Sequence, residues 1–190
     1  MTAAQMLGTI DRQAYDVLSA PTTSAIDAAI SHLTNAANHS KISLATAGVF
    51  AAFGGSRGRR AATFGVAAVT VTSVVANLVV KPIANRRRPD RSEEHRDHSP
   101  LTSHHVPMPS SDSFPSGHTA AAFAFATAVA RVEPRASVVP YLIAVGVGYS
   151  RVHTGVHYPS DVALGALLGA TIGAAIGRAP AVPSRGGGEA

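Results

Sequence analysis

The chain has 190 residues, enough for one domain with a sizeable core. It contains no cysteine, which excludes disulfides and thiolate metal sites. Hydrophobic residues make up 46% of the chain and charged residues 14%, with a net charge of +5. The basic residues gather at the ends of apolar runs, as in membrane proteins, instead of forming a stripe, so we do not expect a nucleic-acid partner.

Residues 1–38 form the first segment, which we expect to be helical and amphipathic. Its apolar residues recur with helical spacing, and the charged residues between them include Asp11, Arg12, Asp16 and Asp27. No basic region followed by an apolar run stands at its start, so we expect no cleaved signal peptide. The segment is either a weak sixth span or a helix along the membrane interface.

Residues 39–178 are expected to form a membrane-embedded domain, and residues 179–190 a flexible tail. The domain contains five apolar runs, at residues 42–56, 61–80, 118–130, 136–150 and 162–177. Only the run at 61–80 reaches the roughly 20 residues that span a bilayer; the others also suit buried helices of a soluble bundle. Uncharged interiors and basic ends favour the membrane. The predicted fold class is all-α, a polytopic transmembrane helical bundle.

The polar loop at residues 86–113 is rich in Arg, His, Ser and Pro. Its histidines invite a metal-site interpretation through His95, His98, His104 and His105. Their spacing fits no strong zinc template and implies no fixed helix. We therefore expect a solvated loop without a metal.

The last apolar run carries a glycine every fourth residue, at Gly165, Gly169, Gly173 and Gly177. On a helix these glycines form a flat face that lets another backbone approach closely. We favour packing of this face inside one bundle, and a homodimer through it is the alternative.

Three polar clusters interrupt the apolar domain. One follows the run at 61–80, a second (PSGH, residues 115–118) precedes the next run, and a third (SRVHTGVHYPSD, residues 150–161) joins the last two. If successive runs are antiparallel spans, all three clusters lie at the same membrane face. We therefore predict an active site built from helix ends on that face.

The cations of these clusters suit a phosphate. Lys81, Arg88 and Arg151 would converge, and two guanidinium forks with one ammonium match a tetrahedral anion. A helix that starts at Ser116 offers free N–H groups to that anion, and Gly117 lets the backbone come close.

The histidines supply the remaining chemistry. His118 and His157 can divide the roles of proton donor and nucleophile between them. Asp161, four residues after His157, can fix the imidazole tautomer and raise its basicity, as an aspartate does in a catalytic triad.

These residues resemble the type 2 phosphatidic acid phosphatase family, which shares its active site with the vanadium haloperoxidases. The family has a Lys-to-Arg-Pro motif, a PSGH motif and a Ser-Arg-to-His-to-Asp motif. The sequence carries them as KPIANRRRP (81–89), PSGH (115–118) and SRVHTGVHYPSD (150–161). Every fixed position matches, and the resemblance covers residues 61–177.

The resemblance implies an enzyme that hydrolyses a lipid-linked phosphate or diphosphate monoester without a metal or other cofactor. His157 would become a phosphohistidine with support from Asp161. His118 would protonate the leaving oxygen and then activate water. The residues that would bind the phosphoryl oxygens are Lys81, Arg88, Ser116, Gly117 and Arg151.

Three polar residues near the motifs stand outside them. We expect His153 at a helix end or in a pocket wall, and Arg86 and Arg87 as interfacial charges. Two alternative functions remain open: a vanadate-dependent haloperoxidase, whose relatives are typically larger and soluble, and a non-catalytic membrane protein.

We expect a multi-pass protein of the plasma membrane with lipid partners. The basic residues opposite the predicted site are Arg57, Arg59, Arg60, Arg131, Arg135, Arg178 and Arg185. Without the three phosphate-binding cations, those on the site face are Lys41, Arg86, Arg87, Arg91 and Arg96. The positive-inside rule then predicts an extracytoplasmic active site. The substrate stays open among phosphatidic acid, phosphatidylglycerophosphate, isoprenyl phosphates and lipid-linked sugar phosphates, which share one headgroup chemistry.

Overall fold

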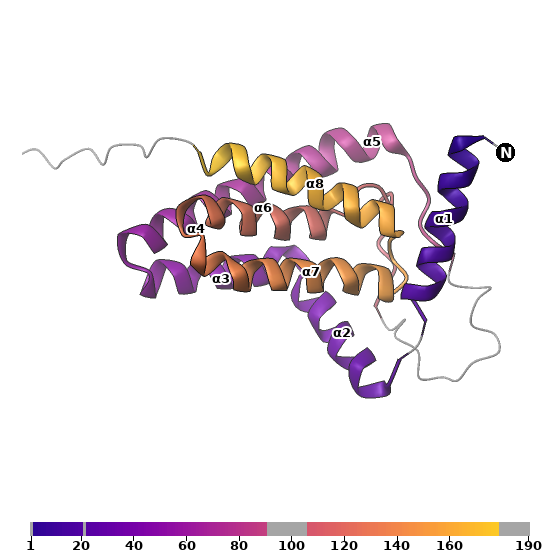
Figure 1. Cartoon of the computed structure of the whole chain (residues 1–190), viewed down its shortest axis with the longest axis horizontal. Coiled ribbons are helices and arrows are strands. Elements are labelled where there is room, and N and C mark those ends of the chain that lie inside the picture. The colour runs from indigo at the N-terminus through magenta and orange to yellow at the C-terminus, as the bar shows by residue number, and fades with distance from the viewer. Residues whose placement is uncertain (1, 21, 91–105, 179–190) are drawn as a thin grey trace, which may run out of the picture.

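The structure, a computed structural model, describes residues 2–20, 22–90 and 106–178, and every regular element in these ranges is helical (Figure 1). The α-helices are α1 (Ala3–Leu18), α2 (Ser24–Ala36), α3 (Lys41–Phe53), α4 (Gly55–Val74), α5 (Lys81–Ala84), α6 (Gly117–Val132), α7 (Val138–His153) and α8 (Pro159–Ile176). Shorter elements are the 3-10 turns η1 (Asn38–Ser40) and η3 (Arg135–Ser137) and the π-helix η2 (Val75–Val80). The predicted tail and the four loop histidines lie outside the described residues.

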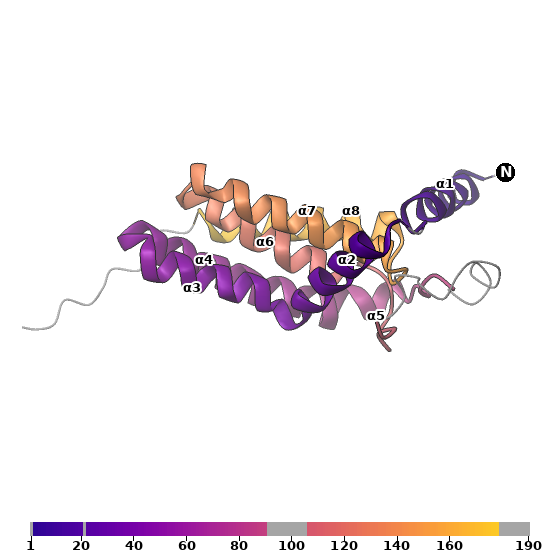
Figure 2. The same ribbon diagram turned by 90° about the horizontal axis from the view of Figure 1, so that it is seen from below.

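The long axis of the molecule is followed by helices α3, α4, α6, α7 and α8 (Figures 1 and 2). The end of α5, the start of α6, the end of α7 and the start of α8 lie at one end of this bundle (Figure 1). The convergence expected from alternating spans is therefore present, and the motif residues share that end.

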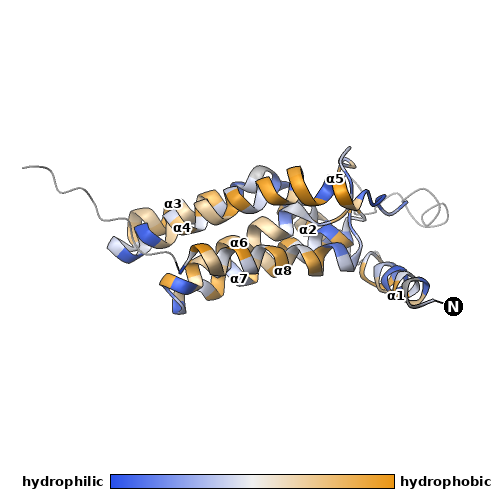
Figure 3. Cartoon of the chain, turned by 90° about the horizontal axis from the view of Figure 1, so that it is seen from above, coloured by the Kyte–Doolittle hydropathy of each residue, from blue (hydrophilic) through white to orange (hydrophobic). Residues whose placement is uncertain are grey.

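The bundle has small residues inside and large apolar residues outside. Ala120, Ala124 and Ala128 of α6 have no exposed surface, whereas Leu78 and Leu142 are 72% and 67% exposed. Hydrophobic residues recur along the long helices (Figure 3), and many of the large ones are exposed. Water would penalise so much outward-facing apolar surface, whereas lipid accommodates it. The transmembrane helical bundle predicted from the sequence is thus confirmed.

Two helical stretches in the described part of the chain are long and apolar enough to cross a bilayer, Gly55–Ala84 with 30 residues and Pro159–Ile176 with 18. The first joins α4, η2 and α5 into one rod. Pro82 has no N–H, so regular α-helical bonding cannot continue through it, and the π-helix η2 lies immediately before that interruption.

The N-terminal segment is not aligned with the long helices of the bundle. Helix α1 lies crosswise at the site end, and α2 leaves the bundle obliquely (Figures 1 and 2). On α1, Tyr15 is buried while Met6, Leu7 and Ile10 are exposed. This placement favours the interfacial interpretation of α1 over a sixth span.

His153 links this segment to the bundle. It is the last residue of α7 and fully buried, with Nε2 2.9 Å from Asp27 Oδ1 and Nδ1 3.1 Å from the Leu18 carbonyl oxygen. It stacks on Tyr149. The expected helix-end position is correct, but its contacts give His153 a structural role that ties α2 to α7.

Helices α6 and α8 run parallel in close backbone contact. A Cβ added to Gly165, Gly169 or Gly173 would lie 2.7, 2.0 or 2.4 Å from a carbonyl oxygen of α6 or its N-cap. The facing carbonyls belong to Ser116, Ala120 and Ala124, which also recur every four residues. The glycine face is filled inside the chain, as we favoured, and is not free for the alternative dimer.

We predict that Gly169→Ala lowers the thermal unfolding midpoint in detergent, since even a methyl group collides with backbone there and overpacking costs about 1–3 kcal/mol. Gly48→Ala is the matched control, because its Cβ would meet nothing within 4 Å. It should be neutral or more stable by about 0.5–1 kcal/mol. Equal midpoints for the two variants would contradict the packing.

Candidate active site

Lys81 and Arg88 meet at one hydroxyl group. The helix that carries Lys81 ends at Asn85, whose left-handed backbone (φ 41°) turns the chain, and Arg88 follows in the extended segment. Ser111 Oγ accepts from Lys81 Nζ at 3.2 Å and from Arg88 Nη2 at 3.3 Å. Two cations seven residues apart are therefore held side by side.

Arg151 lies in the last turn of α7 and is 1% exposed. Its Nη1 donates to Thr34 Oγ1 at 2.8 Å, while its Nε has no hydrogen-bond partner among the described residues. A buried guanidinium with an unused donor is costly unless a ligand completes it. Arg151 is thus poised to bind an anion.

A tight turn brings His157 back to Arg151. Gly155 adopts the left-handed φ of 70° that this turn requires. The backbone N–H groups of Val156 and His157 then both donate to the Arg151 carbonyl oxygen, at 3.2 and 3.1 Å. The histidine is fixed against the end of α7.

The contacts of His157 define its tautomer. Nε2 lies 3.2 Å from Arg88 Nη1, and a guanidinium only donates, so Nε2 accepts. The ring proton is then on Nδ1, which is 3.5 Å from Asp161 Oδ2 and makes no hydrogen bond among the described residues. The lone pair of Nε2 points toward the cations, as a nucleophile for a bound phosphate requires.

Asp161 joins the starts of α6 and α8. Its backbone carbonyl accepts from the Ser116 N–H at 2.9 Å. Its carboxylate accepts from the Tyr158 N–H at 2.9 Å and from the Ser113 hydroxyl. Asp161 has no exposed surface, so these donors hold it in one orientation.

The start of α6 faces the site without a side-chain cap. The hydroxyl of Ser116 pairs with Thr119 Oγ1 at 2.9 Å, which leaves the first-turn N–H groups, beginning at Gly117, to an anion. No side chain at Gly117 blocks their approach.

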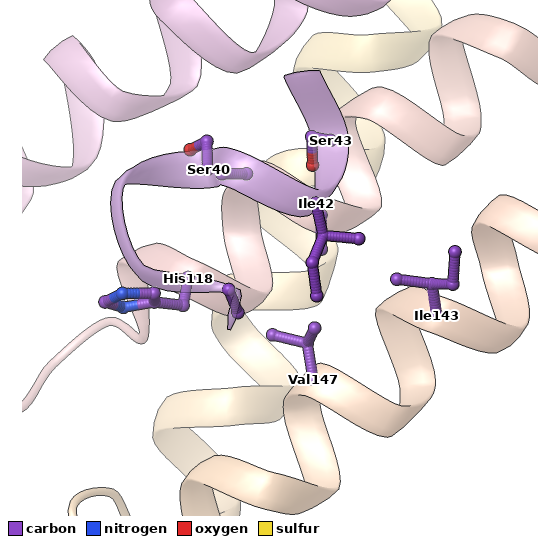
Figure 4. Close-up of a pocket in the computed structure, with 9 residues that line it drawn as sticks. Ser40, Ile42, Ser43, His118, Ile143 and Val147 are labelled. Carbon is purple, nitrogen blue, oxygen red and sulfur yellow. The ribbon is translucent and has the colours of Figure 1, made fainter. Parts of the chain in front are cut away.

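His118 lies beside the cations. Its Nε2 is 3.1 Å from Asn38 Oδ1. Together with Lys81, Gly117 and Asn77 it lines a cavity of about 160 Å³. A smaller neighbouring pocket has His118 at its edge and Ile42, Ile143 and Val147 in its apolar wall (Figure 4).

All eight residues predicted for the site therefore gather at one end of the bundle. Arg86, expected as an interfacial charge, has a further contact that the sequence did not predict, because its Nη1 bonds Asp161 Oδ1 at 2.7 Å. The sequence also did not single out Ser111, Ser113, Thr34 and Asn38, which position the others. The polar run SSDS before PSGH is the one signal that points to the two serines.

The described residues contain no group of three or more His, Cys, Asp or Glu that could hold a metal ion. The negative charge of a phosphoryl group would instead face Lys81, Arg88 and Arg151. Independence from metals stays a prediction.

Known proteins share both the sequence pattern and the fold. The lipid A 1-phosphatase of Rhizobium johnstonii is 38% identical over 99 residues, 51% of this chain and 38% of that protein. The decaprenylphosphoryl-5-phosphoribose phosphatase of Mycobacterium tuberculosis is 36% identical over 88 residues, 46% of this chain and 44% of that protein. The matches thus cover less than half of these curated relatives.

Two crystal structures have the same fold, each with a TM-score of 0.67. LpxE of Aquifex aeolicus is 24% identical, with 85% of this chain and 91% of that chain covered. The transmembrane PAP2-type phosphatidylglycerolphosphate phosphatase of Bacillus subtilis is 22% identical, with 92% and 85% covered. The family model of the PAP2 superfamily matches residues 60–181, most of the helical bundle and all three motifs. The chain belongs to the PAP2 superfamily.

Proposed function

We propose that this chain is an integral-membrane phosphatase that hydrolyses a lipid-linked phosphate or diphosphate monoester through a phosphohistidine at His157. The observation that carries the proposal is the orientation of His157, whose Nε2 lone pair faces Arg88 while Nδ1 faces Asp161. The two curated relatives described above, both named as phosphatases of lipid-linked substrates, support the same substrate class.

In the first step, Lys81, Arg88, Arg151 and the first N–H groups of α6 hold the phosphoryl oxygens. His157 Nε2 attacks phosphorus, so an N–P bond forms as the bond to the leaving oxygen breaks. His118 gives its proton to that oxygen, and Asp161 stabilises the imidazolium. The cations neutralise the charge that develops on the phosphoryl group.

In the second step, His118, now neutral, takes a proton from water. The water oxygen attacks phosphorus and the N–P bond breaks, which releases phosphate and restores the neutral imidazole of His157. The cavity that His118 shares with Lys81 and Asn77 provides room for the leaving alcohol and then for water.

The lipid tail would extend from the site onto the outer, apolar surface of the bundle. Leu78, Val79 and Ile83 are exposed on the rod that carries Lys81, so acyl or isoprenyl chains can contact them while the phosphate reaches the cations. Phosphatidic acid, phosphatidylglycerophosphate, isoprenyl phosphates and lipid-linked sugar phosphates all fit this arrangement.

We place the protein in the plasma membrane with its site outside the cytoplasm. The start of α4, the end of α6 and the end of α8 lie at the end of the bundle away from the site (Figure 1). Arg57, Arg131 and Arg178 stand in or next to these helix ends, and positive charge favours the cytoplasmic side. A reporter fused after Arg178 should therefore be cytoplasmic. An extracytoplasmic reporter would reverse the orientation.

The phosphohistidine can be trapped. His118→Ala should still form the phosphoenzyme from an aryl phosphate, whose leaving group needs little protonation, but should hydrolyse it slowly. Alkaline quenching, which preserves phosphohistidine, should then show label on the peptide that contains His157, with or without EDTA. His157→Ala should be inactive.

His32→Ala is the matched control for that experiment, because His32 is an exposed histidine on α2, and it should turn over like the wild type. Label on a serine or aspartate, or complete loss of turnover on chelation, would refute the mechanism.

The pH dependence of kcat/KM should show that His157 attacks as a neutral imidazole. Burial lowers the pKa of His157 from 6.5 to about 4; Asp161 opposes the shift, and the charges of Arg88 and Arg151 add to it. We expect kcat/KM for an aryl phosphate, whose leaving group needs little protonation by His118, to persist below pH 6.5 and to decline toward pH 4 after correction for substrate ionisation. In that window the unfolded chain binds the proton first, so the free energy of unfolding falls as pH falls. An acid limb at the ordinary histidine pKa would contradict this environment.

A further inference from the structure

The two carboxylate oxygens of Asp161 have different partners. Oδ2 faces His157 Nδ1 and accepts from Ser113 and from the Tyr158 N–H. Oδ1 accepts from Arg86 Nη1 at 2.7 Å. Because the carboxyl group is planar, the donor on Oδ1 helps to fix the direction in which Oδ2 points.

Arg86 is itself held from the opposite side by α1. Its Nη2 donates to Asp11 Oδ2 at 2.6 Å, across 75 residues of sequence. Its Nη1 also donates to Ser160 Oγ at 2.7 Å, and its guanidinium lies 4.4 Å from the centre of the Tyr158 ring. The arginine therefore has two carboxylates, a hydroxyl and an aromatic face around it.

Asp11 is equally well anchored. It accepts from the Ser160 N–H at 2.9 Å and from the Ser160 hydroxyl at 2.6 Å, both at the start of α8. Tyr15, one turn later on α1, lies 5.6 Å from Tyr158 between ring centres. Helix α1 is thus docked on the short segment that carries both His157 and Asp161.

We infer that Asp11 acts through Arg86 to position the Asp161 carboxylate for His157, so that the N-terminal helix α1 completes the active site. Arg86 and Asp11 are positioning residues in this relay. The inference rests on the proposed function, in which Asp161 orients and stabilises the imidazole of His157.

Each partner in the relay has a physical task. Asp161 has no exposed surface, and its charge requires a donor on each oxygen. The Arg86 side chain is 32% exposed and would gain rotamer freedom in water without a second anchor. Asp11, whose side chain is 10% exposed, provides that anchor and balances the second half of the guanidinium charge.

The test is a double-mutant cycle in detergent with an aryl phosphate. Arg86→Gln should lower kcat on the order of 100-fold, since a small displacement of catalytic groups has that effect, and should leave KM nearly unchanged because Arg86 faces Asp161. Arg86→Lys should restore part of kcat. Asp11→Asn should lose roughly tenfold, and the double variant should match Arg86→Gln alone.

Two exposed neighbours give matched controls of the same charge. Arg87→Gln changes the next residue after Arg86, and Asp16→Asn changes an exposed carboxylate on α1. Both should retain the wild-type kcat. Unfolding midpoints of all variants separate loss of positioning from loss of the fold.

A second readout does not need turnover. In nitrogen NMR of isotope-labelled histidine, the signals of His157, assigned with His157→Gln, should show Nδ1–H as the dominant neutral tautomer in the wild type and a mixture in Arg86→Gln. A wild type that releases no phosphate would refute the proposed function, and the tautomer would still decide the relay. An unchanged kcat and tautomer in Arg86→Gln, an unchanged kcat in Asp11→Asn, or losses that multiply in the double variant would overturn the inference.

Discussion

The backbone contact between α6 and α8 is the constraint on which the rest of this structure depends. Glycines at 165, 169 and 173 let α8 lie against carbonyl oxygens of α6 and its N-cap, with the two helices parallel. Their N-termini are consequently neighbours, and the hydrogen bond from the Ser116 N–H to the Asp161 carbonyl joins them. The start of α6, where we propose that the anion binds, and the carboxylate beside His157 thus share one rigid unit. In lipid, where apolar side chains gain little by mutual burial, such close approach of small residues is a principal source of helix association.

The polar groups at this end of the bundle form hydrogen bonds with one another. The donors that remain unused indicate what kind of ligand the site would bind. Ser111, Thr34 and Val156 accept from the three cations, yet Arg151 Nε keeps an unused donor among the described residues. These three acceptors are uncharged, so they leave the positive charge of the cations unbalanced, and a phosphoryl group would be a suitable counter-ion. His157, the proposed nucleophile, shares this environment, in which burial favours its neutral imidazole and Nε2 faces Arg88. In the proposed mechanism, the same donors would serve both phosphate binding and catalysis.

The residues at this end of the bundle could be predicted from the sequence because they lie in short motifs with fixed spacing. Fixed spacings predict the eight candidate site residues, and alternation of spans brings their clusters together without any knowledge of side-chain contacts. Arg86 shows where such reasoning stops: its partner Asp11 lies 75 residues away, and no periodicity links the two. The glycine repeat predicted close packing within the bundle, but the partner helix α6, with Ser116, Ala120 and Ala124 at the same four-residue spacing, is identified only by the structure. The crosswise position of α1 depends on tertiary contacts that composition cannot specify.

The central claim is that phosphate transfer proceeds through two displacements, with His157 as the first acceptor. The stereochemical course at phosphorus tests it most directly. A phosphate monoester made chiral with the three stable oxygen isotopes would be offered to the purified protein with an alcohol as second acceptor. Each in-line displacement inverts phosphorus, so this account predicts overall retention of configuration in the product ester. Overall inversion would show a single direct displacement and would contradict a phosphohistidine intermediate.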